Sequence, residues 1–213
     1  MSQGSVRLEL LTGVAVVDGE RLTLTDRQSE LLALLCVCGG YASADALASL
    51  LWPEAPRNEA FMAVWIDAND LRRVLPNPSM LRLEPHGYVL DADVALDLWD
   101  IDEYLRAHRC ASRPRCAIDR QLYGRLVRFH ETQRFRIARW RWSRSLRELA
   151  DRYRRDVGLW LAWGLLAEQR VYEAHGVARD LVATYPSCRS SRGVLETVQR
   201  RMAAYAGTAA IAG

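Results

Sequence analysis

The residues best suited to chemistry lie in one arginine-rich segment, residues 120–155. It holds 12 arginines against three acidic residues, Glu131, Glu148 and Asp151. Two tryptophans, Trp140 and Trp142, are interleaved with the arginines in "RFRIARWRWSRS". Guanidinium groups bind phosphate in a bidentate manner, and aromatic rings stack on bases. The candidate contacts to phosphate or to an acidic partner are Arg134, Arg136, Arg139, Arg141 and Arg144.

The charge along the chain leaves other roles open for these arginines. Residues 1–100 contain 7 Arg and 15 acidic residues, whereas residues 101–213 contain 22 Arg and 11 acidic residues. The basic half can therefore dock on the acidic half, within the molecule or between molecules, or meet an acidic protein partner. A solvated surface is the remaining alternative. Docking and phosphate binding are about equally favoured, because the acidic half is always present at high effective concentration. All 29 basic residues are arginine, and codon bias in a GC-rich genome explains the absence of lysine.

Catalytic and metal-binding motifs are absent from the sequence. It has no P-loop, G-x-G-x-x-G, H-E-x-x-H or G-x-S-x-G, and its four histidines are scattered. Cys110 and Cys116 lie near His108, but their spacing is not that of a zinc ligand pair. Five cysteines, an odd number, do not indicate a disulfide framework. We expect no enzyme, no metal and no cofactor.

The sequence gives no indication of a membrane segment. No apolar run reaches the length of a bilayer span, and Met1–Gly4 does not begin a signal peptide. We therefore expect a cytoplasmic protein with no membrane partner.

The first half of the chain predicts a small antiparallel sheet, three helices and a hairpin. The strands are expected at Val6–Leu11, Ala15–Val17 and Arg21–Leu24. Helices are expected from the N-cap Thr25, whose capping box includes Gln28, to Gly39, then from the N-cap Ser43 to Trp52, and from Asn58 to Leu75. Met80–Leu83 and Tyr88–Leu90 form the hairpin. This order is that of a winged helix, expected at residues 1–98.

The second half predicts an all-α domain, residues 99–213. A helix begins near Asp97, and apolar residues then recur at helical spacing through Leu122–Gln133 and through Ile137–Tyr153. Trp160–Ala167, Val171–Tyr185 and Ser190–Tyr205 complete the expected helices. The stretch "LAWGLLAEQRVYEAHGVARDLVATYP" resembles one tetratricopeptide-type helical pair. The predicted fold class is therefore α+β, a winged helix followed by a tetratricopeptide-like helical domain.

Four segments in this order carry a family resemblance: "LTLTDRQSELLALL", "SADALASLLWPEAP", "LRRVLP" and "LRLEPHGYVLD". They resemble the OmpR/PhoB-type effector domain over about residues 6–98. "DLWDIDEYL" is similar to the entry into the helical domain of pathway-specific activators that carry a bacterial transcriptional activator domain. The resemblance implies that the third helix enters the major groove. The implied DNA contacts are Arg57, Asn58, Trp65, Asn69, Arg72 and Arg73, with Arg82 and His86 on the wing.

The third helix carries two carboxylates, Asp67 and Asp70, and two functional hypotheses remain because of them. DNA phosphates repel carboxylates, which weakens DNA binding by this helix. The first hypothesis is nevertheless a transcription regulator that binds promoter DNA. Its helical half would contact RNA polymerase, a regulatory protein or a second copy in a homodimer. The alternative is a degenerate winged helix that has lost DNA affinity and binds a partner protein, with Trp65 as the anchor. Trp65 could instead belong to the core.

Overall fold

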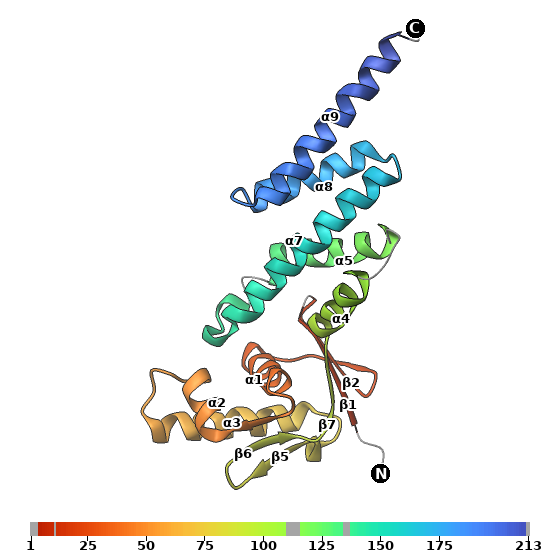
Figure 1. The fold of residues 1–213 in the computed structure, drawn as a ribbon. Coiled ribbons are helices and arrows are strands. Elements are labelled where there is room, and N and C mark those ends of the chain that lie inside the picture. Colours follow the sequence, from red (N-terminus) through yellow and green to blue (C-terminus); the bar gives the residue numbers. More distant parts are fainter. Residues whose placement is uncertain (1–3, 11, 110–115, 134–136, 212–213) are drawn as a thin grey trace. The chain divides into compact units, whose positions relative to one another are not determined.

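The computed structural model describes residues 4–10, 12–109, 116–133 and 137–211. The chain forms two compact units, whose helices and strands are labelled in Figure 1. Unit 1 comprises Met1–Asp100 and Arg128–Arg147, and unit 2 comprises Ile101–Val127 and Glu148–Gly213. The fold is mixed α+β, with all strands of the described residues in unit 1. None of the helices among these residues combines the length and the apolarity of a membrane span.

The first sheet of unit 1 has four strands in the order β3-β2-β1-β7. β1 (Gly4–Glu9), β2 (Val14–Val17) and β3 (Glu20–Leu22) pair antiparallel, as the sequence predicts. Asp18 and Gly19 both have positive φ angles, 49° and 86°, which the tight turn between β2 and β3 requires. β7 (Ala92–Leu96) pairs parallel to β1 and was not predicted.

Three helices follow the first three strands, at the positions that their capping residues predict. In α1 (Asp26–Val37), the Thr25 hydroxyl accepts from the backbone N–H of Gln28 at 3.2 Å, and Gln28 Oε1 accepts from the backbone N–H of Thr25 at 2.9 Å. In α2 (Ala44–Leu51), the Ser43 hydroxyl accepts from the backbone N–H of Ala46 at 3.1 Å. Both predicted N-caps are confirmed. α3 (Arg57–Val74) begins after Pro56.

The second sheet has the order β4-β6-β5, and its strands β5 and β6 follow α3 in the chain after the short helix η1 (Pro78–Met80). β5 (Leu81–Glu84) and β6 (Gly87–Leu90) form the predicted hairpin. β4 (Tyr41–Ser43), which pairs with β6, was not predicted. A Cβ atom at Gly87 would lie 2.3 Å from the backbone oxygen of Ala42, so this strand pairing requires glycine. The core of unit 1 includes Leu31, Leu35, Leu47, Val64, Leu71 and Leu81, all buried.

Residues 128–147 belong to unit 1 although they follow the first part of unit 2 in sequence. They contain the π-helical turn η2 (Phe129–Gln133) and the 3-10 turn η3 (Arg141–Ser143). The sequence predicted one helix through Ile137–Tyr153, and this is wrong, because α7 begins only at Arg144. The buried Ser143 hydroxyl lies 2.6 Å from the carbonyl oxygen of Ile137 and 2.7 Å from that of Trp140, which stabilises a tight turn instead.

Unit 2 is helical in its described residues. α4 (Asp97–Arg109) and α7 (Arg144–Ala167) each begin in unit 1 and continue into unit 2, which also contains most of α5 (Cys116–Arg128). α8 (Val171–Thr184) and α9 (Arg189–Ile211) form a helical pair, and Ala174 and Ala178 of α8 are fully buried. Trp160–Ala167 is the end of α7 rather than a separate helix. In this unit the buried Arg154 donates to both carboxylate oxygens of the partly exposed Asp180, at 3.0 and 2.8 Å.

Candidate nucleic-acid interface

The exposed side of α3 is the surface on which the sequence predicts DNA binding. Ala60, Val64, Ala68 and Leu71 are buried and fix the inward side of the helix. The opposite side, here called the outer face of α3, carries residues separated by three or four positions. They are Asn58, Met62, Trp65, Ile66, Asn69 and Arg73. Arg57 and Arg72 lie on its flank at helical spacing.

Three large apolar side chains lie at the middle of the outer face of α3. Met62 is 58% exposed, Trp65 50% and Ile66 47%. Trp65 is therefore not a core residue of unit 1, and that alternative is wrong. Exposed apolar residues that cluster in this way mark a binding surface more often than scattered ones do.

The carboxylate of Asp67 does not belong to the outer face of α3. It is half-buried, and one of its oxygens accepts a hydrogen bond from the indole N–H of Trp52 at 3.1 Å. The guanidinium of Arg27 lies over the Trp52 ring, 4.2 Å from its centroid. Burial raises the pKa of Asp67, while the Trp52 bond and Arg27 oppose the shift. Asp67 thus connects α3 to the end of α2.

Asp70 is held in two contacts on the side of α3. Its carboxylate accepts from Arg73 at 2.6 Å, and its backbone oxygen accepts from the Gln28 side chain at 3.2 Å. The single arginine of the outer face, Arg73, is therefore already paired with a carboxylate. The Asn69 amide, in turn, donates to the backbone oxygen of Trp65 at 2.8 Å.

The other predicted cations around α3 also have partners. Arg57 pairs with Asp45 at 2.7 Å and lies over Phe61, and Arg72 donates to the backbone oxygen of Pro78 at 3.3 Å. On the hairpin, Arg82 lies 3.6 Å from both Glu84 and Asp91. The predicted wing residue His86 is exposed at the turn of the hairpin, where its backbone oxygen accepts from Ala44. A phosphate contact by Arg57, Arg73 or Arg82 would therefore compete with a neighbouring carboxylate.

Residues 137–147 of the arginine-rich segment, here called the basic strap, are attached to the acidic part of unit 1. Arg139 lies 3.5 Å from Asp26 at the start of α1, and Arg141 pairs with Glu54 in the loop between α2 and α3. Arg144, at the start of α7, is exposed. Arg134 and Arg136 lie outside the described residues. These pairs are of the kind that the intramolecular docking alternative predicts.

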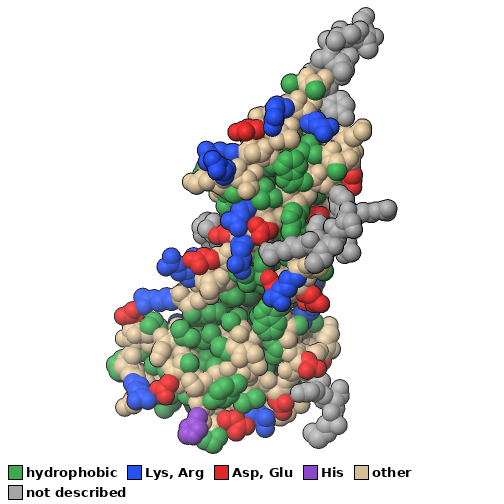
Figure 2. Space-filling model, in the orientation of Figure 1, with side chains coloured by type: hydrophobic (Ala, Val, Ile, Leu, Met, Phe, Trp, Pro, Cys, Tyr) green, Lys and Arg blue, Asp and Glu red, His purple; other side chains and the backbone are tan. Residues whose placement is uncertain are grey.

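Residues 128–147, which include the basic strap, change the net charge of unit 1. Residues 1–100 contain 7 Arg and 15 acidic residues, whereas unit 1 as a whole contains 14 Arg and 16 acidic residues. The large negative charge of the first hundred residues is thus nearly balanced within the unit. On the face of the molecule drawn in Figure 2, basic and acidic side chains alternate, with hydrophobic side chains between them.

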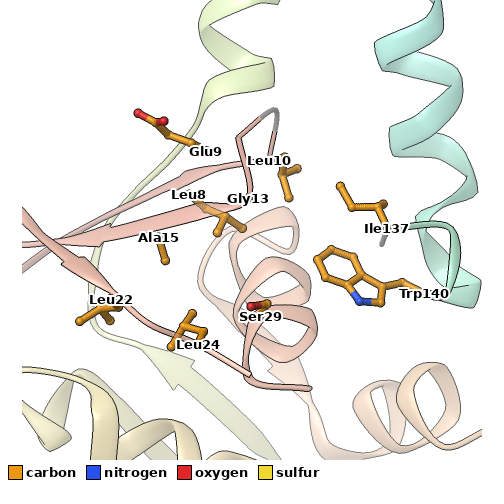
Figure 3. Close-up of a pocket in the computed structure, with 10 residues that line it drawn as sticks. All are labelled: Leu8, Glu9, Leu10, Gly13, Ala15, Leu22, Leu24, Ser29, Ile137 and Trp140. Carbon is orange, nitrogen blue, oxygen red and sulfur yellow. The ribbon is translucent and has the colours of Figure 1, made fainter. Parts of the chain in front are cut away.

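Ile137 and Trp140 insert the basic strap into the body of unit 1 (Figure 3). They are 3% and 5% exposed and border a small cavity of about 30 Å³. Its other lining residues are Leu8, Glu9, Leu10, Gly13, Ala15, Leu22, Leu24 and Ser29. Trp142 stacks on Trp140 with ring centroids 5.6 Å apart. Trp140 is therefore a core residue, and its buried ring is not available to stack on bases.

A wider hollow of about 460 Å³ lies at the loop between α2 and α3, and Arg27, Arg139 and Arg141 contribute to its wall. Three glutamates, Glu30, Glu54 and Glu59, share the same wall, so its charges are mixed. Glu30 is buried and accepts from Arg27 at 2.9 Å. Burial raises the pKa of Glu30, and Arg27 opposes this shift. The balance of charges does not favour a simple anion in this hollow.

No group of three or more metal-ligating side chains occurs among the described residues. Cys36, Cys38, Cys116 and Cys188 are free thiols, and burial raises the pKa of Cys36 to about 12. Cys110, the other member of the loosely spaced Cys/His group, lies outside the described residues.

Comparisons with solved structures give a similar protein. No protein-family model matches the sequence, and no curated protein matches it. The similar structure is Mycobacterium tuberculosis EmbR in complex with a low affinity phosphopeptide, with 18% sequence identity and a TM-score of 0.48 over 94% of this chain. The match covers 66% of the EmbR chain, so this chain spans less than two thirds of its length.

Proposed function

We propose that the protein is a cytoplasmic transcription regulator of the OmpR/PhoB type, which binds duplex promoter DNA through α3 and the β5–β6 hairpin. The helical part would contact RNA polymerase, a regulatory protein or a second copy of the chain. The proposed functional division is residues 1–98 and residues 99–213, with the basic strap attached to the first. No cofactor is required.

The observation that carries this proposal is the open outer face of α3 with arginines at its margins. Arg57 and Arg72 lie on the flank of the helix, Arg73 lies at its C-terminal end, and Arg82 lies on the hairpin. Exposed ion pairs contribute only about 0.2–1 kcal/mol each, so phosphates can replace the carboxylate partners of these arginines at low cost. Asp67, one of the two carboxylates of α3 that would repel phosphate, accepts a hydrogen bond from Trp52 instead.

The test is fluorescence anisotropy with labelled duplex DNA over a series of salt concentrations. The variant R72A/R73A removes two candidate phosphate contacts, and R192A/R201A removes two exposed arginines of α9 as the matched control. We expect R72A/R73A to bind more weakly and to reduce the slope of log affinity against log salt by about 1–2. The control should bind as the unmodified protein does. Equal slopes for all three proteins would contradict the role of α3.

A second candidate function is favoured by the apolar middle of the outer face of α3. Met62, Trp65 and Ile66 are about half exposed and form the kind of anchor that protein interfaces use. In this case the winged helix is a protein-interaction module without DNA affinity. If the purified protein does not shift the mobility of any DNA duplex at low salt, the DNA-binding function is excluded. The protein-interaction module then takes its place.

A further inference from the structure

The composition of the outer face of α3 bears on which base pairs it can recognise. The face consists of two amides, Asn58 and Asn69, three apolar side chains, and Arg73. Arg73 lies at the C-terminal end of the face and is paired with Asp70. The middle of the face therefore presents methyl, thioether, indole and amide groups rather than charge.

Each base edge in the major groove selects a different side-chain chemistry. Guanine presents two acceptors that arginine or lysine reads, whereas thymine presents a methyl group that apolar side chains contact. Adenine presents one acceptor and one donor, which match the two ends of an asparagine amide. The outer face of α3 contains the groups for adenine and thymine and, at its middle, none of the cations that read guanine.

We infer that α3 selects sites rich in A·T pairs, with Met62, Trp65 and Ile66 against thymine methyl groups and with Asn58 and Asn69 directed to adenine. The inference rests on the proposed function and names the DNA class that the same surface recognises. The exposures of the three apolar residues, between 47% and 58%, leave each of them accessible to a partner in the groove.

The geometry of Asn69 is compatible with adenine recognition. Its Nδ2 donates one hydrogen to the backbone oxygen of Trp65 at 2.8 Å, which fixes the orientation of the amide. An amide nitrogen carries two hydrogens and the amide oxygen is an acceptor, so one donor and one acceptor remain for adenine. Asn58, four residues before Met62, is exposed on the same face.

Replacement of thymine by uracil tests the inference, because it removes only the methyl group from the groove. A duplex site is first selected from a random library with the unmodified full chain. Anisotropy then compares this duplex with the same duplex containing uracil. We expect about fourfold weaker binding for each contacted methyl group that is lost. The variant M62A/I66A should show a smaller difference between thymine and uracil, whereas I118A, which shortens an exposed residue of α5, should retain it.

The outcomes separate this inference from the function on which it rests. Selected sites dominated by G·C pairs, or equal affinities for thymine and uracil duplexes, would overturn the A·T preference while DNA binding stands. If no duplex is bound, the proposed function fails and this inference fails with it, and a protein partner becomes the occupant of the face.

Discussion

Asp67 of α3 accepts a hydrogen bond from the indole N–H of Trp52, with 3.1 Å between the two atoms. This bond turns an acidic side chain of the proposed recognition helix away from the surface that would meet phosphates. Arg27 lies over the same indole and pairs with Glu30, so the end of α2, the start of α1 and the middle of α3 are joined through polar groups.

The different surroundings of Asp67 and Asp70 predict different effects on DNA binding. Asp70→Asn weakens the ion pair with Arg73 and should raise the affinity for duplex DNA about two- to fivefold, because Arg73 becomes available to phosphate. Asp67→Asn should change the affinity less than twofold, because this carboxylate is bound to Trp52. Anisotropy at one fixed salt concentration compares the two variants. A larger gain for Asp67→Asn would show that Asp67 faces the DNA.

The attachment of the basic strap can be tested by exchange of one ion pair. Arg141→Glu places a second carboxylate beside Glu54 and should lower the free energy of unfolding by about 0.2–1 kcal/mol. The double variant Glu54→Arg/Arg141→Glu restores opposite charges and should recover most of this loss. Urea unfolding monitored by tryptophan fluorescence measures both variants. Equal losses in the single and the double variant would show that these two side chains do not interact.

The packing around Gly158 in α7 leaves no room for a larger side chain in unit 2. A Cβ atom at this position would lie 2.6 Å from Tyr123 Cε2 and 2.8 Å from Leu181 Cδ2. Gly158→Ala should therefore destabilise the protein by about 1–3 kcal/mol despite the better helix propensity of alanine. Gly176→Ala in α8 meets no atom within 4 Å and should stabilise it by about 0.5–1 kcal/mol. Thermal unfolding followed by circular dichroism distinguishes the two, and a stable Gly158→Ala variant would contradict this packing.

Glu30 predicts an unusual dependence of stability on pH. Burial raises its pKa above the ordinary value of 4.5, so the folded state favours the protonated form. The stability that Glu30 contributes is then present at low pH and is lost as the pH rises through its folded pKa. The difference in free energy of unfolding between the unmodified protein and Glu30→Gln should therefore decrease as the pH rises above about 4.5. Urea titrations at several pH values measure this difference.

Arg27 provides the control for the pH experiment. Its charge and hydrogen bond lower the pKa of Glu30, so Arg27→Gln should move the loss of stability to higher pH. A difference between the unmodified protein and Glu30→Gln that stays constant with pH, or one that increases, would contradict the assigned burial of Glu30.

Local signals in the sequence predict much of unit 1. The capping box of Thr25 and Gln28, the N-cap Ser43 and the hairpin around Gly87 depend on neighbouring residues, and the structure contains all of them. β7 could not be predicted in this way, because its partner β1 is separated from it by the whole of the three-helix region. Short, poorly patterned strands form only when a distant partner supplies their hydrogen bonds.

The candidate site was less accessible to sequence analysis than the fold. Sequence spacing places Asp67 on α3. Only the structure shows that its carboxylate accepts a hydrogen bond from Trp52. Trp140 has the neighbours of a nucleic-acid-binding residue, yet it is buried against Leu8 and Leu10 of a strand region more than 120 residues earlier. Met62 and Ile66 were missed as site residues, and their positions between Asn58 and Asn69 at helical spacing were the available signal.

Hydrogen–deuterium exchange of the full chain with and without duplex DNA tests the central claim most directly. We expect DNA to slow exchange in α3, residues 57–74, and in the hairpin, residues 81–90, with little change in α8 and α9. Protection confined to α8 and α9, or no protection of α3 at a DNA concentration that saturates binding, would contradict the assignment of the outer face of α3 as the DNA-reading surface.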